Sequence, residues 1–105
     1  MDLPEQDRAE RAKLLKPFAD VRVQKHVQLL MRGERCTHEL AEKASIPQST
    51  VSYHMKILCE SGLVKRRRDG KWTYYRLCRE GVEALKAELE RMAQECEQCL
   101  NLMQR

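Results

Sequence analysis

Two cysteines near the end of the chain have the spacing of a ligand pair for a soft ion. Cys96 and Cys99 are three positions apart, so in a helix their Cβ atoms lie about 5–6 Å apart on one face. Side-chain rotation can bring both sulfurs to one ion, with bonds of about 2.3 Å. The pair lies near a predicted helix C-terminus, where the dipole disfavours a thiolate, and a bound ion would supply the missing stabilisation. The spacing therefore predicts a soft metal or metalloid site at Cys96 and Cys99.

Two other interpretations of this pair stay open at the level of sequence. Free cysteines are often buried as small apolar side chains. Two neighbouring thiols can also be oxidised to a bridge or react with persulfides, which would make the pair a redox or reactive-sulfur sensor.

The other cysteines provide a second candidate site and two packing residues. Cys36 and His38 form the alternative ligand pair. Cys59 and Cys78 are expected to pack in the interior. The odd total of 5 cysteines fits a disulfide scaffold poorly and indicates thiols that are kept reduced. No apolar run reaches the length of a membrane span, and the acidic start lacks the basic and apolar regions of a signal peptide, so we expect a cytoplasmic protein.

The 105 residues have the length of one domain, 1–105. Its N-terminal part, 1–32, is predicted to hold two helices. Apolar residues at helical spacing indicate a helix over 8–18, which Pro17 interrupts, and a second helix that ends at Met31. His26 is interpreted as a solvated residue of that second helix.

Residues 37–61 are predicted to form a helix-turn-helix. Thr37 is expected to cap the first, short helix, and a turn at 45–47 leads to the second. Gln48 or Ser49 is expected to cap this second helix. Its buried face is predicted to consist of Val51, Met55, Ile57 and Leu58.

A β-hairpin, or wing, is predicted over 63–77. Asp69-Gly70 between two β-rich runs is a strong signal for a two-residue hairpin turn. The segment 79–104 has no proline and is predicted to be one long helix. The predicted fold class is mostly α with a β-hairpin wing, a winged helix-turn-helix.

The positive charge of the chain is concentrated in the wing. Between residues 65 and 76 there are six Lys and Arg residues and one Asp, a net charge of +5, whereas the whole chain carries +4. Such a segment is typical of an element that contacts phosphates. Short polar side chains at the start of the second helix suit contact with base edges. The residues predicted to bind double-stranded DNA are Gln48, Ser49, Thr50, Ser52, Tyr53, His54, Lys56, Arg66, Arg67, Arg68 and Lys71.

The last helix carries a narrow apolar seam. Its members are spaced 3, 4, 3, 4, 3 and 4, which is a heptad pattern held for three heptads, and a seam of this width pairs with another helix. The seam residues are Val82, Leu85, Leu89, Met92, Cys96, Cys99 and Met103. We predict a homodimer through these terminal helices, with residues 8–18 helping to cover the seam.

Several segments resemble the ArsR/SmtB family of bacterial repressors. They are Gly33-Glu34-Arg35-Cys36, the block 49–58, Glu60-Ser61-Gly62-Leu63-Val64, Asp69-Gly70-Lys71-Trp72 and Tyr75-Arg76-Leu77. The resemblance implies a homodimeric winged-helix repressor that releases its operator when an inducer, often a metal or metalloid ion, binds.

The chain also departs from the family pattern. Where the arsenical-type box has Cys-x-Cys, this sequence has Cys36 and His38, and the last helix lacks the histidines of the zinc-type site. The usual Asp-Pro-x-Arg is altered to Asp20-Val21-Arg22. Neither inducer site of the family is therefore carried over intact.

The sequence as a whole predicts a repressor that binds operator DNA without a cofactor and is released by a soft ion such as trivalent arsenic or antimony. One alternative is a redox or reactive-sulfur sensing repressor of the same fold. Another is a winged-helix interaction module that binds protein or RNA through its basic hairpin. An enzyme is not expected, because no phosphate-binding loop, activated nucleophile or closed catalytic metal motif is present.

Overall fold

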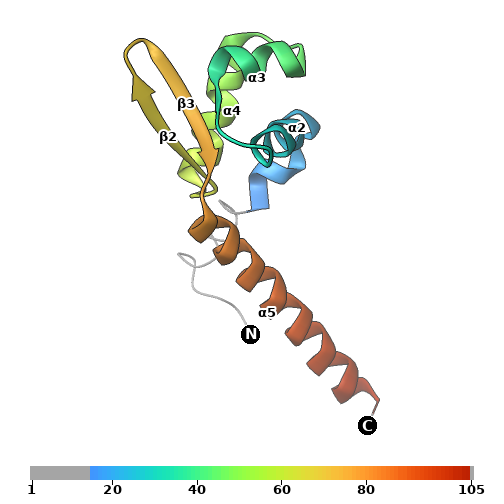
Figure 1. The fold of residues 1–105 in the computed structure, drawn as a ribbon. Coiled ribbons are helices and arrows are strands. Elements are labelled where there is room, and N and C mark those ends of the chain that lie inside the picture. The colour runs from blue at the N-terminus through green and yellow to red at the C-terminus, as the bar shows by residue number, and fades with distance from the viewer. Residues whose placement is uncertain (1–14, 105) are drawn as a thin grey trace.

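A computed structural model describes residues 15–104. The elements follow in the order η1 Lys16–Ala19, α2 Val21–Leu30, β1 Arg35–Cys36, α3 Thr37–Ala44, α4 Gln48–Glu60, β2 Val64–Asp69, β3 Trp72–Leu77 and α5 Arg79–Met103. Figure 1 shows a head built from α2, α3, α4 and the hairpin, from which α5 projects as a long stalk. This arrangement is a winged helix-turn-helix and confirms the predicted fold class. The helix expected over 8–18 lies mostly outside the described residues.

The two helices before the turn are fixed by local caps. The Asp20 side chain accepts a hydrogen bond from the backbone N–H of Arg22 at 2.8 Å and so caps α2. Thr37 was expected to cap α3, but the cap is Cys36, whose backbone N–H donates to Oε1 of Glu39 at 3.2 Å. The cap shifts by one residue because Glu39 occupies the position from which a carboxylate reaches back to the first N–H.

The second helix of the pair, α4, also begins differently from the expectation. Its N-cap is Pro47 and Gln48 is already helical, so neither Gln48 nor Ser49 is the cap. Proline suits this position because it lacks the N–H that the helix start would leave unpaired. Val51, Met55 and Leu58 are fully buried as predicted, whereas Ile57 is only half-buried. The three buried side chains form the core with Val23, Leu30, Leu40, Leu63 and Tyr75.

The sheet has three antiparallel strands in the order β1-β3-β2. The edge strand β1 was not predicted, because two residues are too few to show an alternating pattern. Arg35 pairs with Tyr75 and Cys36 with Tyr74. The hairpin turn is also shifted from the expected Asp69-Gly70, since Asp69 pairs with Trp72 and Gly70-Lys71 form the loop. Gly70 adopts a φ of 61°, which a residue with a side chain rarely adopts.

The terminal helix α5 extends the molecule to 60 Å, against 24 and 20 Å in the other two directions. None of its residues is buried. Of the predicted seam, Leu85 packs partly against the core of its own chain, while Val82, Leu89, Met92 and Met103 are exposed. None of the helices in residues 15–104 is long and apolar enough to cross a membrane.

Candidate nucleic-acid interface and thiol sites

The outer face of α4 presents a row of polar side chains. Five residues predicted to contact DNA are exposed there: Gln48, Ser49, Ser52, Tyr53 and Lys56. Thr50 is half-buried. The row begins at the N-terminus of α4, where free backbone N–H groups and the helix dipole favour a negatively charged partner.

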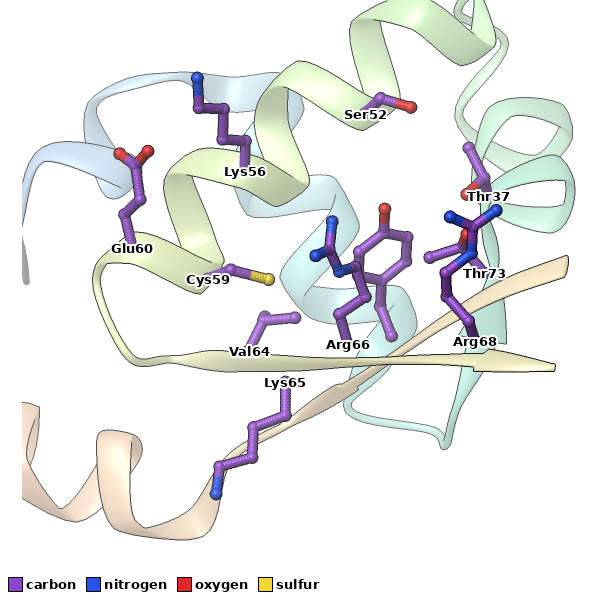
Figure 2. Close-up of a pocket in the computed structure, with 11 residues that line it drawn as sticks. Thr37, Ser52, Lys56, Cys59, Glu60, Val64, Lys65, Arg66, Arg68 and Thr73 are labelled. Atoms are coloured by element: carbon purple, nitrogen blue, oxygen red, sulfur yellow. The ribbon is translucent and has the colours of Figure 1, made fainter. Parts of the chain in front are cut away.

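A cleft of about 720 Å³ separates α4 from the wing. Ser52 and Lys56 line it from α4, and Arg66 and Arg68 line it from β2 (Figure 2). In the picture both arginines stand on the side of β2 that faces α4, whereas Lys65 extends from the other side. The alternation of strand residues thus places two of the three consecutive arginines at the cleft. The result is an open, basic surface that two separate elements share.

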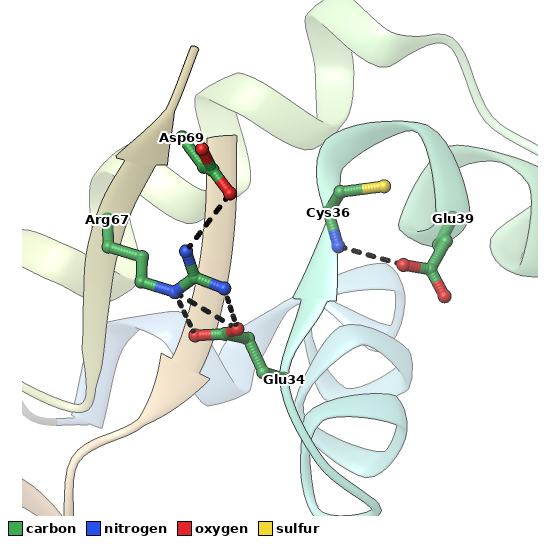
Figure 3. A network of polar contacts seen from close by, with 5 residues as sticks. All are labelled: Glu34, Cys36, Glu39, Arg67 and Asp69. Carbon is green, nitrogen blue, oxygen red and sulfur yellow. Dashed lines mark hydrogen bonds and ion pairs between the residues drawn. The ribbon is translucent and has the colours of Figure 1, made fainter. Parts of the chain in front are cut away.

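Arg67, the arginine between them, has other partners. Its guanidinium donates to both carboxylate oxygens of Glu34, with the shortest contact, Nη2 to Oε1, at 2.6 Å (Figure 3). It also lies over the ring of Tyr74, 4.5 Å from the centroid. From the sequence alone Arg67 is grouped with its neighbours, because the three arginines are consecutive. Strand alternation was the signal that could have separated Arg67 from that set.

His54 was predicted to contact DNA, but only 1% of its surface is exposed. The helical turn that exposes Tyr53 and Lys56 directs His54 inward, where Nε2 lies 3.8 Å from Oδ2 of Asp20. Burial lowers the pKa of His54 below its usual value. His54 is therefore a packing residue and is removed from the candidate interface.

His26 was interpreted as solvated and is instead fully buried. It lies on the same face of α2 as Val23 and Leu30, which also belong to the interior. Neither ring nitrogen has a hydrogen-bond partner in the described chain, and its ring centroid is 5.2 Å from that of His54. Burial, with His54 nearby, lowers the pKa of His26 from 6.5 to about 4.

The cysteines fall into two groups. Cys96 and Cys99 are exposed on α5, so their sulfurs are not packed inside their own chain. Cys36 and Cys78 are buried, and Cys59 is half-buried at the cleft. The packing expected for Cys78 is confirmed.

The alternative ligand pair combines a buried thiol with an exposed ring. Cys36 is buried, whereas His38 is exposed and interacts with Gln48 and Glu42. Within residues 15–104, no three His, Cys, Asp or Glu side chains lie close enough together to hold a metal ion.

Comparison with known proteins relates these features to a family. A sequence model described as "Bacterial regulatory protein, arsR family" matches residues 26–66. The "Arsenical resistance operon repressor" of Bacillus subtilis (strain 168) is 39% identical over 61 residues, which are 58% of this chain and 58% of that protein. The chain thus aligns with little more than half of that relative. The "Cadmium resistance transcriptional regulatory protein CadC homolog" of Staphylococcus aureus is 34% identical over 85 residues, 80% of this chain and 70% of the relative.

Solved structures agree with this assignment. The homodimeric winged helix-turn-helix DNA-binding domain of a possible ArsR-family transcriptional regulator from Mycobacterium bovis matches with a TM-score of 0.68. The two sequences are 30% identical, and the match covers 89% of each chain. The similarity therefore extends through the helix-turn-helix and the wing and into the terminal helix. The chain belongs to the ArsR family of bacterial regulatory proteins.

Proposed function

We propose that the protein is a homodimeric transcriptional repressor that binds double-stranded operator DNA and releases it when a soft ion binds. The DNA would lie against α4 and the wing. The inducer, an ion of the arsenite or antimonite type, would bind Cys96 and Cys99. No cofactor is needed for DNA binding itself.

The observation that carries the DNA-binding function is the basic cleft shared by α4 and β2. Ser52 and Lys56 line it from α4, and Arg66 and Arg68 line it from β2. An α-helix fits the major groove, where its short polar side chains meet base edges, while arginines on a neighbouring hairpin neutralise phosphates. The surface that this requires is exposed over its whole length. Lys71, at the tip of the wing, extends the positive charge away from the body.

Dimerisation is supported by the exposed seam of α5. Leu89 is 50% exposed, and Met103 is 79% exposed. Apolar side chains at heptad spacing are stabilised when a second helix covers them. The M. bovis relative is a homodimer. A two-fold axis along α5 would direct two copies of α4 toward successive half-sites of one operator.

The proposed inducer site follows from the same geometry. Cys96 and Cys99 are exposed on the seam side of α5, so two copies of the helix would bring four thiols together. Thiolates are the preferred donors for soft ions. Ligation across the axis would shift the two α5 helices and change the distance between the two copies of α4. The ion releases DNA only to the extent that it binds this second arrangement more tightly.

The DNA-binding function is tested by measuring the affinity of the reduced protein for a duplex from its own promoter. A scrambled duplex of equal length serves as control. We expect a clear preference for the promoter and a steep loss of affinity between 50 and 200 mM salt, of about 10³-fold if six phosphates are contacted. Equal affinity for both duplexes, or preference for RNA, would overturn the proposal.

The inducer is tested by titrating the complex in parallel with arsenite, antimonite, zinc, cadmium and peroxide. The double variant Cys96→Ser/Cys99→Ser should stay bound to the promoter duplex at arsenite concentrations that release the duplex from the wild type. Cys59→Ser, a matched control on the same thiol chemistry, should respond like the wild type. Unchanged release in the double variant would remove this site. Release by peroxide in metal-free buffer, with a Cys96–Cys99 disulfide seen by mass, would instead establish the redox alternative.

A further inference from the structure

A salt bridge connects the loop before β1 to the middle of β2, although β3 lies between these two strands. Nη2 of Arg67 is 2.6 Å from Oε1 of Glu34, and Nε is 3.1 and 3.0 Å from the two carboxylate oxygens. Both ends of the guanidinium edge are thus engaged, as Figure 3 shows. Such bidentate pairs fix orientation as well as distance, which a single ion contact does not.

The same guanidinium contacts the strand that it crosses. Arg67 lies over the ring of Tyr74, its cross-strand partner, at 4.5 Å, and Nη1 is 4.0 Å from Oδ2 of Asp69. The hydrogen bond from Arg67 lowers the pKa of Glu34, and the same bond raises the pKa of Arg67. The positive charge of Arg67 is therefore paired within the protein, although 52% of the side chain stays exposed.

The Glu34–Arg67 contact lies where the third strand ends, because Tyr74, the partner of Arg67, is the last residue toward the wing tip that pairs with β1. The edge strand β1 pairs with only two residues of β3, Tyr74 and Tyr75, so the outer part of the hairpin has no third strand beside it. A two-stranded ribbon by itself is marginally stable and twists easily. The Glu34–Arg67 contact lies on the face of the sheet that turns away from α4, directly behind the cleft.

We propose that Glu34 and Arg67 form a clamp that positions the wing for DNA. The clamp holds β2 at the inclination at which Arg66 and Arg68, on either side of Arg67 but on the opposite face, reach the phosphates. Glu34 and Arg67 are positioning residues, and neither touches the DNA. This inference rests on the proposed DNA-binding function and assigns the residues that set its geometry.

For Glu34→Gln, the clamp predicts a change in DNA affinity opposite in sign to the change that net charge alone would cause. Replacing Glu34 by Gln removes a negative charge beside a DNA-binding surface, which by charge alone would strengthen binding. The clamp requires the reverse, and we expect Glu34→Gln to weaken binding to the promoter by about fivefold, the effect of an exposed ion-pair network. Arg67→Ala should weaken binding to the promoter by a similar factor at every salt concentration.

The salt dependence separates positioning from phosphate contact. Arg66→Ala and Arg68→Ala should each reduce the slope of log K against log salt by about 0.9. Arg67→Ala should leave that slope unchanged, because its charge is already paired. Lys25→Ala, which removes an exposed cation on α2 away from the clamp, is the matched control and should stay within about twofold of the wild type.

The charge-exchanged variant Glu34→Arg/Arg67→Glu completes the test, because it keeps the net charge and restores the pair in reverse. We expect it to regain most of the affinity that Arg67→Ala loses, with thermal unfolding confirming that each variant folds. Tighter binding by Glu34→Gln, or a reduced slope in Arg67→Ala, would overturn the clamp. A loss of promoter affinity in Lys25→Ala equal to that in Arg67→Ala would also overturn it. A wild type without preference for the promoter would instead overturn the proposed function itself.

Discussion

Nε2 of His54, in the middle of α4, lies 3.8 Å from Oδ2 of Asp20, the residue that caps α2. On its other side His54 faces the ring of His26, at 5.2 Å between centroids. Both imidazoles are buried, so the contact between α2 and α4 contains two groups that resist protonation. The helix that carries the candidate DNA surface is therefore held in place by packing that depends on pH.

We expect the protein to lose stability as the pH falls from 6.5 to about 4. Burial lowers the pKa of His26 from 6.5 to about 4, so in this range the unfolded chain binds a proton that the folded chain does not. The free energy of unfolding should fall by about 1.4 kcal/mol per pH unit for one such histidine. His54, whose pKa is also lowered by burial, adds to this loss. Urea unfolding at pH 7.5, 6.5 and 5.5, at one protein concentration, measures the effect.

The variant His26→Leu provides the control. Leucine is apolar, like the neighbouring core side chains of Val23 and Leu30. It cannot take up a proton. It should reduce the pH dependence while the protein stays folded at pH 7.5. Equal stability of the wild type at pH 7.5 and 5.5, or an unchanged pH dependence in the variant, would show that the buried imidazoles do not control stability.

Gly81, in the first turn of α5, lies against the backbone of Gly62, the second residue after α4. A Cβ atom at position 81 would collide with the carbonyl group of Gly62. Replacing a helical glycine by alanine normally stabilises the helix by about 1 kcal/mol. Here we expect Gly81→Ala to destabilise the protein by about 1–3 kcal/mol, because the stalk must move away from the head.

The shift in the urea midpoint decides the sign of this effect. Ala84→Gly, at an exposed position one turn further along α5, is the control for helix propensity. It should cost about 1 kcal/mol, as at any exposed helical site. A Gly81→Ala variant more stable than the wild type would mean that α5 does not start against Gly62.

Leu89→Glu should convert the proposed dimer to a monomer. Leu89, the third of the seven seam residues, is 50% exposed, and a carboxylate there would meet its own copy across the two-fold axis. Sedimentation equilibrium gives the mass directly. Ala87→Glu, on the opposite side of α5, should remain dimeric. A wild-type chain that sediments as a monomer, or a Leu89→Glu variant that stays dimeric, would contradict pairing through α5.

The periodicity of the sequence was sufficient to predict the helices and the wing. Apolar residues at helical spacing gave the buried face of α4, of which Val51 and Leu58 are fully buried. The wing followed from turn chemistry, although its loop proved to be Gly70-Lys71 and not Asp69-Gly70. The one-residue error arose because a glycine with positive φ can occupy either position of such a turn.

The side-chain environments could not be predicted in the same way. His26 and His54 were assigned by polarity, yet they are buried because each shares a helical face with core residues such as Val23 and Met55. Arg67 was assigned to the DNA surface from local charge, whereas its partner Glu34 is 33 positions away in the sequence. Contacts of that kind depend on the three-dimensional arrangement of strands, which residue spacing does not contain.

Amide hydrogen exchange with and without the promoter duplex tests most directly where the DNA binds. We predict new protection in the first two turns of α4, around Ser52, and along β2 at Arg66 and Arg68. The outer half of α5 should exchange equally in both samples, since the duplex does not reach it. Protection confined to α5, or no change in α4 and β2 when the duplex is saturating, would contradict the proposed interface.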